Sequence, residues 1–248
     1  MNSYEAQTIK SLRLWQRSML RRPGYLNRLS KKVQDKINSW IPEKVHQGIT
    51  VTLKQMIRGM LYGAKWTTTS KMKFQTLEQM DHAAVEKIKI YRNTAAAEGA
   101  VTGAGGIVLG IADFPLLIGI KLKLLFELAS IYEFPIDDYK ERVYILHIFQ
   151  LAFSSDLHRR SVFVQMQDWN KKAKHLPDDI HQFDWRTFQQ EYRDYIDLAK
   201  MVQLIPVIGA PVGAIVNFRL IRKLGSTAIH AYHMRLLSKQ GENLLPLP

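Results

Sequence analysis

Hydrophobic positions recur every three or four residues along most of the chain, which is the period of an α-helix. In the first stretch these positions are Ile9, Leu12, Trp15 and Met19. Pro23 and Pro42 follow the first two periodic stretches, and proline ends a helix because it lacks an N–H group and clashes with the preceding turn. The pattern predicts a helix before Pro23, a second that ends at Pro42 and a third that continues the period from Ile49.

The rest of the chain keeps the same period. The expected helices cover residues 77–97, the stretch from Pro115 to Pro135, the stretch from an acidic cap at Asp137 or Asp138 to residue 153, residues 156–169 and the stretch after Asp184. Signals of β-strands are scarce. The predicted fold class is therefore all-α, a multi-helix bundle.

Basic residues form a second stripe beside the apolar one. The candidates for contact with a lipid surface are Lys10, Arg13, Trp15, Arg17, Arg21, Lys32 and Lys36. Residues 1–92 hold 18 Lys and Arg against 6 Asp and Glu, and subtraction from the totals of 35 and 22 leaves 17 against 16 for the remainder. Most of the net charge of +13 thus lies in a basic amphipathic region, residues 1–92. Residues 93–248 are expected to form the helical core of the same structural domain.

Two segments rich in small residues, 95–120 and 201–218, depart from this pattern. Their candidate positions for close helix packing or membrane insertion are Gly99, Gly103, Gly106, Gly110, Pro206, Gly209, Pro211 and Gly213. Glycines four residues apart let helix backbones approach closely. The run "GAGGIVLG" is not a phosphate-binding loop, because it fits neither G-x-G-x-x-G nor the P-loop pattern and no strand precedes it. Each segment ends in an acid or amide followed by Phe, so an internal duplication is one interpretation and a chance match another.

The length of the second segment raises the question of membrane insertion. A helix over residues 201–218 would be about 27 Å long, near the roughly 30 Å of a bilayer core. Pro206 and Pro211 are expected to break such a helix, and Glu98 and Asp113 would be costly in the middle of a bilayer. Both segments are therefore predicted to be broken, tightly packed helical hairpins. Burial in a protein core and insertion into one leaflet both stay open.

Few residues suggest chemistry. Glu98, Asp113 and Asn217 are candidates for buried polar or helix-capping roles, and a carboxylate among small apolar residues can also act as an acid, a base or a proton carrier. His230 and His233 lie three residues apart, but no acid at metal-binding spacing lies beside them. We predict no catalytic residue, no metal ligand and no cofactor.

Composition limits the setting of the protein. The absence of cysteine excludes disulfides, thiol nucleophiles and thiolate metal sites. The first 20 residues contain no continuous apolar run, so a signal peptide is not expected. These features favour a cytoplasmic protein that is peripheral to the plasma membrane or partly inserted in it.

The glycine-rich blocks resemble those of a known family. The blocks "AEGAVTGAGGIVLGIADFPLLIGIKLKLLFELASIY" and "LIPVIGAPVGAIVNFRLIRKLGSTAIHAYHMRLL" are similar to the EcsC family, and "RRPGYLNRLSKKVQDKINSWIPEK" matches it more loosely. The resemblance covers residues 11–237. It implies a bacterial helical protein whose gene accompanies the ATPase and membrane subunits of the Ecs ABC transporter, a system linked to protein secretion and regulated proteolysis. The resemblance supplies a context without a mechanism.

The expected function is that of a non-catalytic accessory at an anionic membrane surface, with an ABC transporter ATPase or membrane subunit as partner. Nucleic acid is not favoured, because no helix-turn-helix, RNA-binding or zinc-finger pattern accompanies the charge. One alternative is a hydrolase for lipid or peptide, with Glu98, Asp113 or His230 in one pocket. The other is a soluble cytoplasmic regulator whose glycine-rich segments are sealed inside other helices.

Overall fold

The computed structural model describes residues 3–21, 43–62, 73–104, 114–154, 158–182, 184, 186, 188 and 210–239. The elements of these ranges are helices, so the predicted all-α fold class is confirmed. The α-helices are α1 (Ser3–Leu20), α3 (Glu43–Tyr62), α4 (Leu77–Ala104), α6 (Phe114–Ile131), α7 (Tyr139–Phe153), α8 (Arg159–Met166), α9 (Trp169–Lys172) and α12 (Ala210–Lys239). Two short 3-10 helices are η1 (Ala173–His175) and η2 (Ile180–Gln182).

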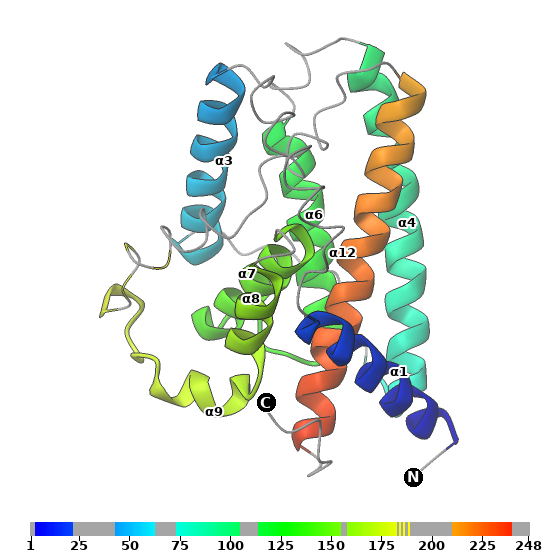
Figure 1. The fold of residues 1–248 in the computed structure, drawn as a ribbon, viewed down its shortest axis with the longest axis vertical. Helices are drawn as coiled ribbons and strands as arrows, with labels where there is room; N and C mark the ends of the chain where they lie inside the picture. The colour runs from blue at the N-terminus through cyan, green and yellow to red at the C-terminus, as the bar shows by residue number, and fades with distance from the viewer. Residues whose placement is uncertain are drawn as a thin grey trace.

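Three long helices form the centre of the fold. Helix α4 runs antiparallel to both α6 and α12 and packs against each of them (Figure 1). The contact between α4 and α12 is tight at Gly225, because a Cβ atom there would lie 2.5 Å from the Cδ1 atom of Ile88. A missing side chain in α12 therefore sets the distance between the two helix backbones.

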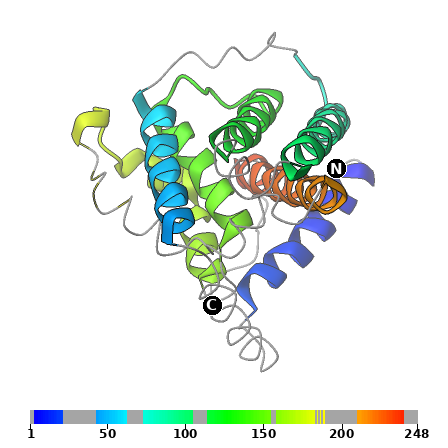
Figure 2. The ribbon, with the colours of Figure 1, turned by 90° about the horizontal axis from the view of Figure 1, so that it is seen from above.

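The other helices surround this centre. Helix α7 is buried along most of its length, and α3 packs against both α6 and α7. Helix α1 lies obliquely across α12 and also contacts α8 (Figure 2). Helices from both sides of the expected boundary at residue 92 thus pack together, and α4 itself crosses that boundary.

Local sequence signals explain several helix ends. The Asp138 side chain caps α7 by accepting the N–H of Lys140 at 2.9 Å, which decides between the two predicted caps. Helix α3 begins directly after Pro42, several residues before the expected start near Ile49, because a proline before a helix removes no hydrogen bond from it. The helix predicted over 156–169 is instead α8 and α9, which are separated at Asp168 by a left-handed turn with φ of 52°.

The glycine-rich segments differ from each other in the structure. Residues 95–104 end α4 and residues 114–120 begin α6, so the described parts of the first segment are two antiparallel arms (Figure 1). Residues 210–218 begin the single 30-residue helix α12. Pro211 lies in the first turn of α12, where an N–H group has no intrahelical partner. Residues 201–209 lie outside the described residues, so the predicted break of a helix at Pro206 and Pro211 stays a prediction.

Several predicted features lie outside the described residues. They are the helix that ends at Pro42, most of the helix after Asp184, and the candidates Lys32, Lys36, Gly106, Gly110, Asp113, Pro206 and Gly209. Among the helices that the structure describes, none combines the length and apolarity needed to cross a membrane.

Candidate functional site

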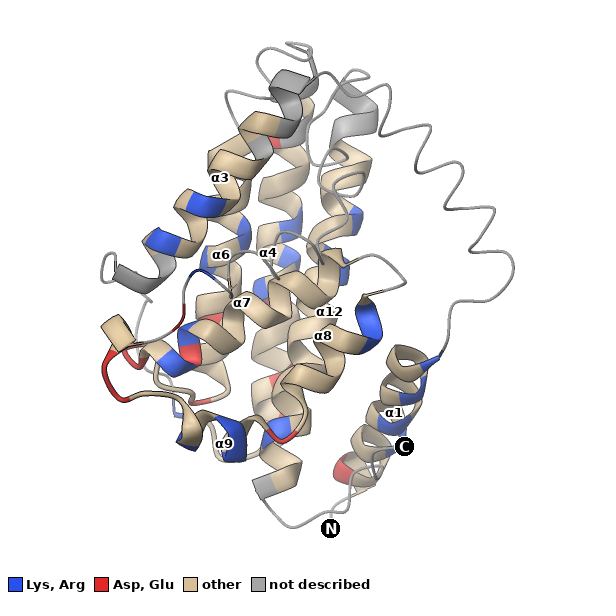
Figure 3. Ribbon diagram, turned by 60° about the vertical axis from the view of Figure 1, so that its left-hand side comes forward, with Lys and Arg blue, Asp and Glu red and all other residues tan. Residues whose placement is uncertain are grey.

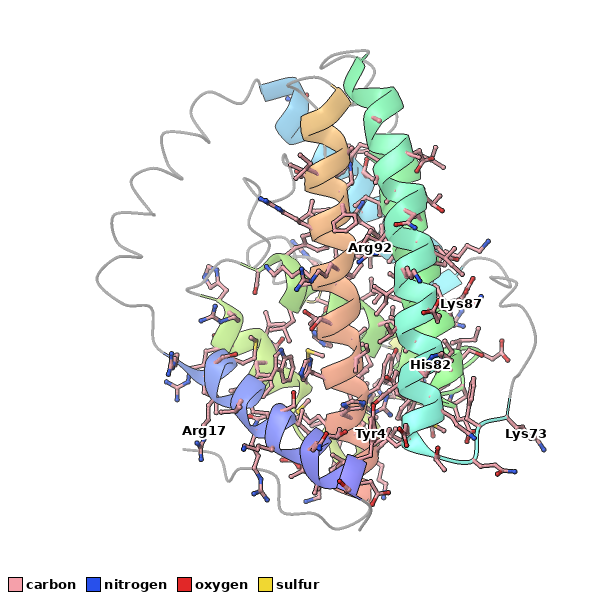
Figure 4. The ribbon with its side chains drawn as sticks, turned by 90° about the vertical axis from the view of Figure 1, so that its right-hand side faces the viewer. Tyr4, Arg17, Lys73, His82, Lys87 and Arg92 are labelled. Carbon is pink, nitrogen blue, oxygen red and sulfur yellow. The ribbon has the colours of Figure 1, made fainter. Side chains whose placement is uncertain are left out.

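Helix α1 exposes the basic stripe expected from the sequence. Its apolar residues Ile9 and Leu12 are buried, at 6% and 0% exposed, against the body of the protein. The opposite face carries four exposed bases, Lys10, Arg13, Arg17 and Arg21. Leu14 lies among them and is 58% exposed. Figure 4 shows Arg17 on α1 pointing away from the central helices.

Trp15 has a different environment from the neighbouring bases. Its indole stacks on the His230 ring, with ring centroids 5.1 Å apart and an interplanar angle of 14°. The edge of Phe163 lies against it, with centroids 5.4 Å apart. Trp15 therefore joins α1 to α8 and α12 and is not part of the exposed basic surface of α1.

A buried carboxylate joins four parts of the fold near the start of α4. Asp81 is 7% exposed. Its Oδ1 atom accepts hydrogen bonds from the Tyr132 hydroxyl and from His233 Nε2, each at 2.6 Å. Its Oδ2 atom accepts one from the Tyr4 hydroxyl at 2.6 Å. Tyr4 reaches this site from α1 (Figure 4), so one side chain fastens α1, α4, the end of α6 and α12 together.

The hydrogen bonds at this site favour the ionised carboxylate. Burial alone raises the pKa of Asp81, but the donors His233, Tyr132 and Tyr4 overcome that effect and hold the pKa below its ordinary value. Burial and the neighbouring carboxylate raise the pKa of Tyr132, so its hydroxyl keeps its proton and stays a donor. The cluster is a satisfied buried ion rather than an open reaction centre.

A second buried ion lies nearer the other end of the same helices. Lys121 of α6 is 0% exposed, and its Nζ atom donates to the Leu117 carbonyl at 3.2 Å and to Asn217 Oδ1 at 3.1 Å. Asn217 is also 0% exposed and lies inside α12, so it does not cap a helix. Burial lowers the pKa of Lys121 to about 7, although the charge of Glu98 acts in the opposite direction. This lysine can therefore change its charge near neutral pH.

A buried ion pair attaches α12 to the outer helices. Arg235 is 4% exposed, and both ends of its guanidinium donate to the carboxylate of Glu141 in α7. Its Nε atom donates to Asn170 Oδ1 in α9 at 3.0 Å. The guanidinium also lies over the rings of Phe134 and Tyr144, at 4.0 and 4.6 Å from their centroids.

The histidines of α12 do not form a metal site in the described part of the chain. His233 binds Asp81, whereas His230 stacks on Trp15 and its Nδ1 atom lies 2.7 Å from the Ser226 carbonyl. No group of three His, Asp or Glu side chains within the described ranges could hold a metal ion. The two histidines therefore have separate structural contacts.

Glu98 and His230 are too far apart to act together on one bond of a substrate. Glu98 acts electrostatically on Lys121, which contacts Asn217. Asn217 and His230 are 13 positions apart in α12, and a helix rises 1.5 Å per residue, so about 20 Å separates these two regions. The hydrolase pocket considered from the sequence does not include both residues, and Asp113 lies outside the described residues.

The described glycine candidates lie at helix ends near Lys121. Gly99 and Gly103 belong to the last turns of α4, and Pro211 and Gly213 belong to the first turn of α12. The sequence patterns did not indicate Lys121, Asp81 or Arg235 as buried ions. A basic residue at position 121, inside the apolar run "LLIGIKLKLLF", was the one signal that could have indicated a buried ion. No comparable signal marks Asp81, because its helix reads as an ordinary amphipathic one.

The EcsC protein family matches residues 6–237 of the chain, which is most of its length. This chain belongs to the EcsC family. Protein EcsC of Bacillus subtilis (strain 168) is 46% identical over 226 residues, which cover 91% of this chain and 93% of that protein. The uncharacterized protein YdbA of the same bacterium is 26% identical over 251 residues, covering 92% and 91% of the two chains. No solved structure matches the chain.

The resemblance noted in the sequence is thus confirmed, and membership of the EcsC family associates the protein with the bacterial Ecs proteins. Neither relative's name states a reaction or a ligand. The exposed surface and the buried clusters of this chain therefore carry the information about its function.

Proposed function

We propose that this EcsC-family protein is a non-catalytic accessory that binds the cytoplasmic surface of the plasma membrane through α1. The observation that carries the proposal is the arrangement of α1, which packs its apolar face inward and exposes Lys10, Arg13, Arg17 and Arg21. Each Lys or Arg near an anionic bilayer contributes about 1 kcal/mol, so four bases give useful affinity without unfolding of the helix. The exposed Leu14 side chain adds apolar contact at the interface.

The transport system is part of the same proposal. The resemblance to the EcsC family implies a link to an Ecs-type ABC transporter. The partner in this proposal is therefore the ATPase or a membrane subunit of such a transporter. Attachment to the leaflet would hold the protein beside such a subunit and reduce the search for it to two dimensions. Affinity purification of the full-length protein from its own bacterium's membranes should recover transporter subunits, and recovery of none would contradict this part.

Binding of the full-length protein to vesicles tests the surface. Vesicles of phosphatidylcholine mixed with phosphatidylserine should bind it, whereas vesicles of pure phosphatidylcholine should bind weakly. The variant Arg13→Glu with Arg17→Glu should lose most of this binding and keep its unfolding midpoint, because both side chains are exposed. The matched control is Lys171→Glu with Lys174→Glu near α9, which makes the same charge change on exposed residues elsewhere.

Salt provides a second readout. The screening length falls from about 10 Å at 0.1 M salt to about 3 Å at 1 M, so electrostatic binding should be released by high salt. Equal binding by the α1 variant and the wild-type protein would remove α1 from the function. Binding that persists at high salt would mean that apolar insertion holds the protein instead.

A further inference from the structure

Helix α12 carries a second set of exposed bases that the sequence did not indicate. It contains no Asp or Glu in its 30 residues. Arg219 and Arg222 are exposed and follow each other at helical spacing, whereas Gly225 packs against α4. Ile215, 52% exposed, and Ser226 continue the same line. We call Ile215, Arg219, Arg222 and Ser226 the α12 stripe.

The α12 stripe leads to the place where α1 crosses. His230, four residues beyond Ser226, stacks on Trp15 of α1. Arg222 is eight residues before His230 and Arg219 is eleven residues before it, so they lie about 12 and 17 Å along α12 from the crossing. The arginines of the α12 stripe therefore lie within about 17 Å, along α12, of the point where α1 crosses, although about 200 positions separate the two helices in the sequence.

Helix α8 brings more positive charge to the same crossing. Phe163 of α8 touches Trp15, and Arg159 and Arg160 lie one turn before Phe163 in that helix. Several of the described acids lie elsewhere, in the turn before α7 and around α9: Glu133, Asp137, Asp138, Asp168, Asp178 and Asp179. Glu5 is the described acid on α1 itself. Figure 3 shows red segments near α7 and α9 and one red segment on α1. Within the described residues, no ion pair joins Arg219 or Arg222 to an acid.

We propose that the α12 stripe is a second membrane-binding element, in which Arg219 and Arg222 bind the phosphate groups of anionic phospholipids beside those bound by α1. The proposal rests on the proposed function of α1 and extends it. Guanidinium groups bind phosphate oxygens with paired hydrogen bonds, and Ile215 supplies an apolar side chain at the same surface. Charge complementarity selects an anionic leaflet as the occupant, because the surface carries bases and a flanking apolar residue.

Contact through two crossing helices fixes the orientation of the protein on the bilayer, which contact through one helix does not. A single helix on a bilayer leaves the body free to rotate about the helix axis. Helix α1 is inclined to α12 (Figure 4), so contact through both fixes one face of the protein against the leaflet. The side around α9, which carries acids together with the bases Lys171 and Lys174, would then face the cytoplasm.

The test compares Arg219→Gln with Arg222→Gln against the wild-type protein on phosphatidylserine-containing vesicles. We expect affinity about 10- to 30-fold weaker, as the loss of two bases at a lipid surface predicts. The control, Lys171→Gln with Lys174→Gln, should bind like the wild-type protein. Unchanged unfolding midpoints would show that both variants fold.

Orientation gives an independent readout. The chain has no cysteine, so a fluorophore on Ser226→Cys or on Asp179→Cys is the only label in each protein. Lipids with a quencher on the headgroup should quench the label at residue 226 strongly and the label at residue 179 weakly.

The outcomes separate the two proposals. If the α1 variant loses binding and the α12 variant does not, the α12 stripe is overturned and the proposed function stands. If neither variant loses binding, both fail. If only the α12 variant loses binding, the stripe stands and α1 is removed. Binding to RNA or DNA that exceeds vesicle binding and disappears in the α12 variant would overturn the lipid assignment.

Discussion

The two buried ions on the central helices are solvated by the protein in opposite ways. Asp81 accepts hydrogen bonds from two hydroxyls and an imidazole, and its pKa is lowered, so the fold favours its charged form. Lys121 has two neutral oxygen acceptors, and its pKa is also lowered, so the fold disfavours its charged form. Both side chains are buried, Asp81 at 7% exposed and Lys121 more completely at 0%. The comparison shows that the number and charge of the partners decide whether a buried ion stabilises a fold.

The position of Gly225 links the two sites. It lies eight residues from Asn217 and eight from His233, midway along α12 between the two ions. The close approach of α4 at Gly225 therefore holds both clusters in register.

The largest expected effect is that of Asp81→Ala. It leaves the Tyr132 hydroxyl and the His233 imidazole buried without their acceptor, so we expect a loss of about 3–5 kcal/mol in the free energy of unfolding. Urea denaturation measures it, and Glu86→Ala on the exposed side of the same helix is the control. The pKa of Asp81 is lowered in the fold. The difference in free energy of unfolding between the wild-type protein and Asp81→Ala should therefore be largest above the ordinary carboxyl pKa and decline as acid protonates Asp81. A loss below 1 kcal/mol, within the usual range for an exposed pair, would contradict the assignment.

The second prediction has the opposite sign. Lys121→Met should stabilise the protein by about 1–4 kcal/mol at about pH 6, because methionine replaces the buried charged side chain with an apolar one of similar length. The folded pKa of about 7 lies below the ordinary lysine pKa of 10.5, so the unfolded chain binds more protons between these values. Wild-type stability should therefore rise with pH in this window, and the advantage of the variant should shrink towards about pH 10.

The control for this prediction lies on the same helix. Lys123 is exposed two residues further on, and Lys123→Met should show no such pH dependence. An advantage of Lys121→Met that stays constant with pH would show that Lys121 has an ordinary pKa.

Gly225→Ala tests the spacing that the two sites share. The new methyl group would meet Ile88 at 2.5 Å, so we expect a loss of about 1–3 kcal/mol by urea denaturation. Gly119→Ala in α6 is the matched control, because nothing lies within 4 Å of its Cβ position. That variant should gain about 0.5–1 kcal/mol from helix propensity. Equal behaviour of the two variants would refute the close approach.

The smallest expected effect is that of Tyr4→Phe. It removes one of three donors from Asp81 at a partly exposed position, so a loss of about 0.5–1.5 kcal/mol is expected. A double-mutant cycle with Asp81→Ala sharpens the result, since the loss should vanish when the acceptor is absent. A loss of the same size in both backgrounds would place the role of the hydroxyl elsewhere.

Sequence patterns were sufficient for local structure and for one surface. The spacing of Ile9 and Leu12 predicted α1, and the stripe from Lys10 to Arg21 is exposed as expected. Asp138 was one of two predicted caps and is the one used. Pro211 lies at the start of α12, a position that proline fits, and the periodicity of the sequence did not say where that helix begins.

The ion sites and the α12 stripe could not be predicted in this way. Asp81 and His233 are 152 positions apart, and no local pattern indicates that their helices meet. Residues 93–248 contain almost equal numbers of acids and bases, and only the fold shows that Arg219 and Arg222 are exposed together on α12.

The sequence by itself determined the helical period, the family and the basic face of α1, because these depend on neighbours within a few turns of one helix. Only the tertiary structure decided which side chains share a cluster, how a buried charge is solvated and which exposed bases lie on one face. Those properties depend on contacts between helices, and such contacts follow from packing that residues such as Gly225 permit.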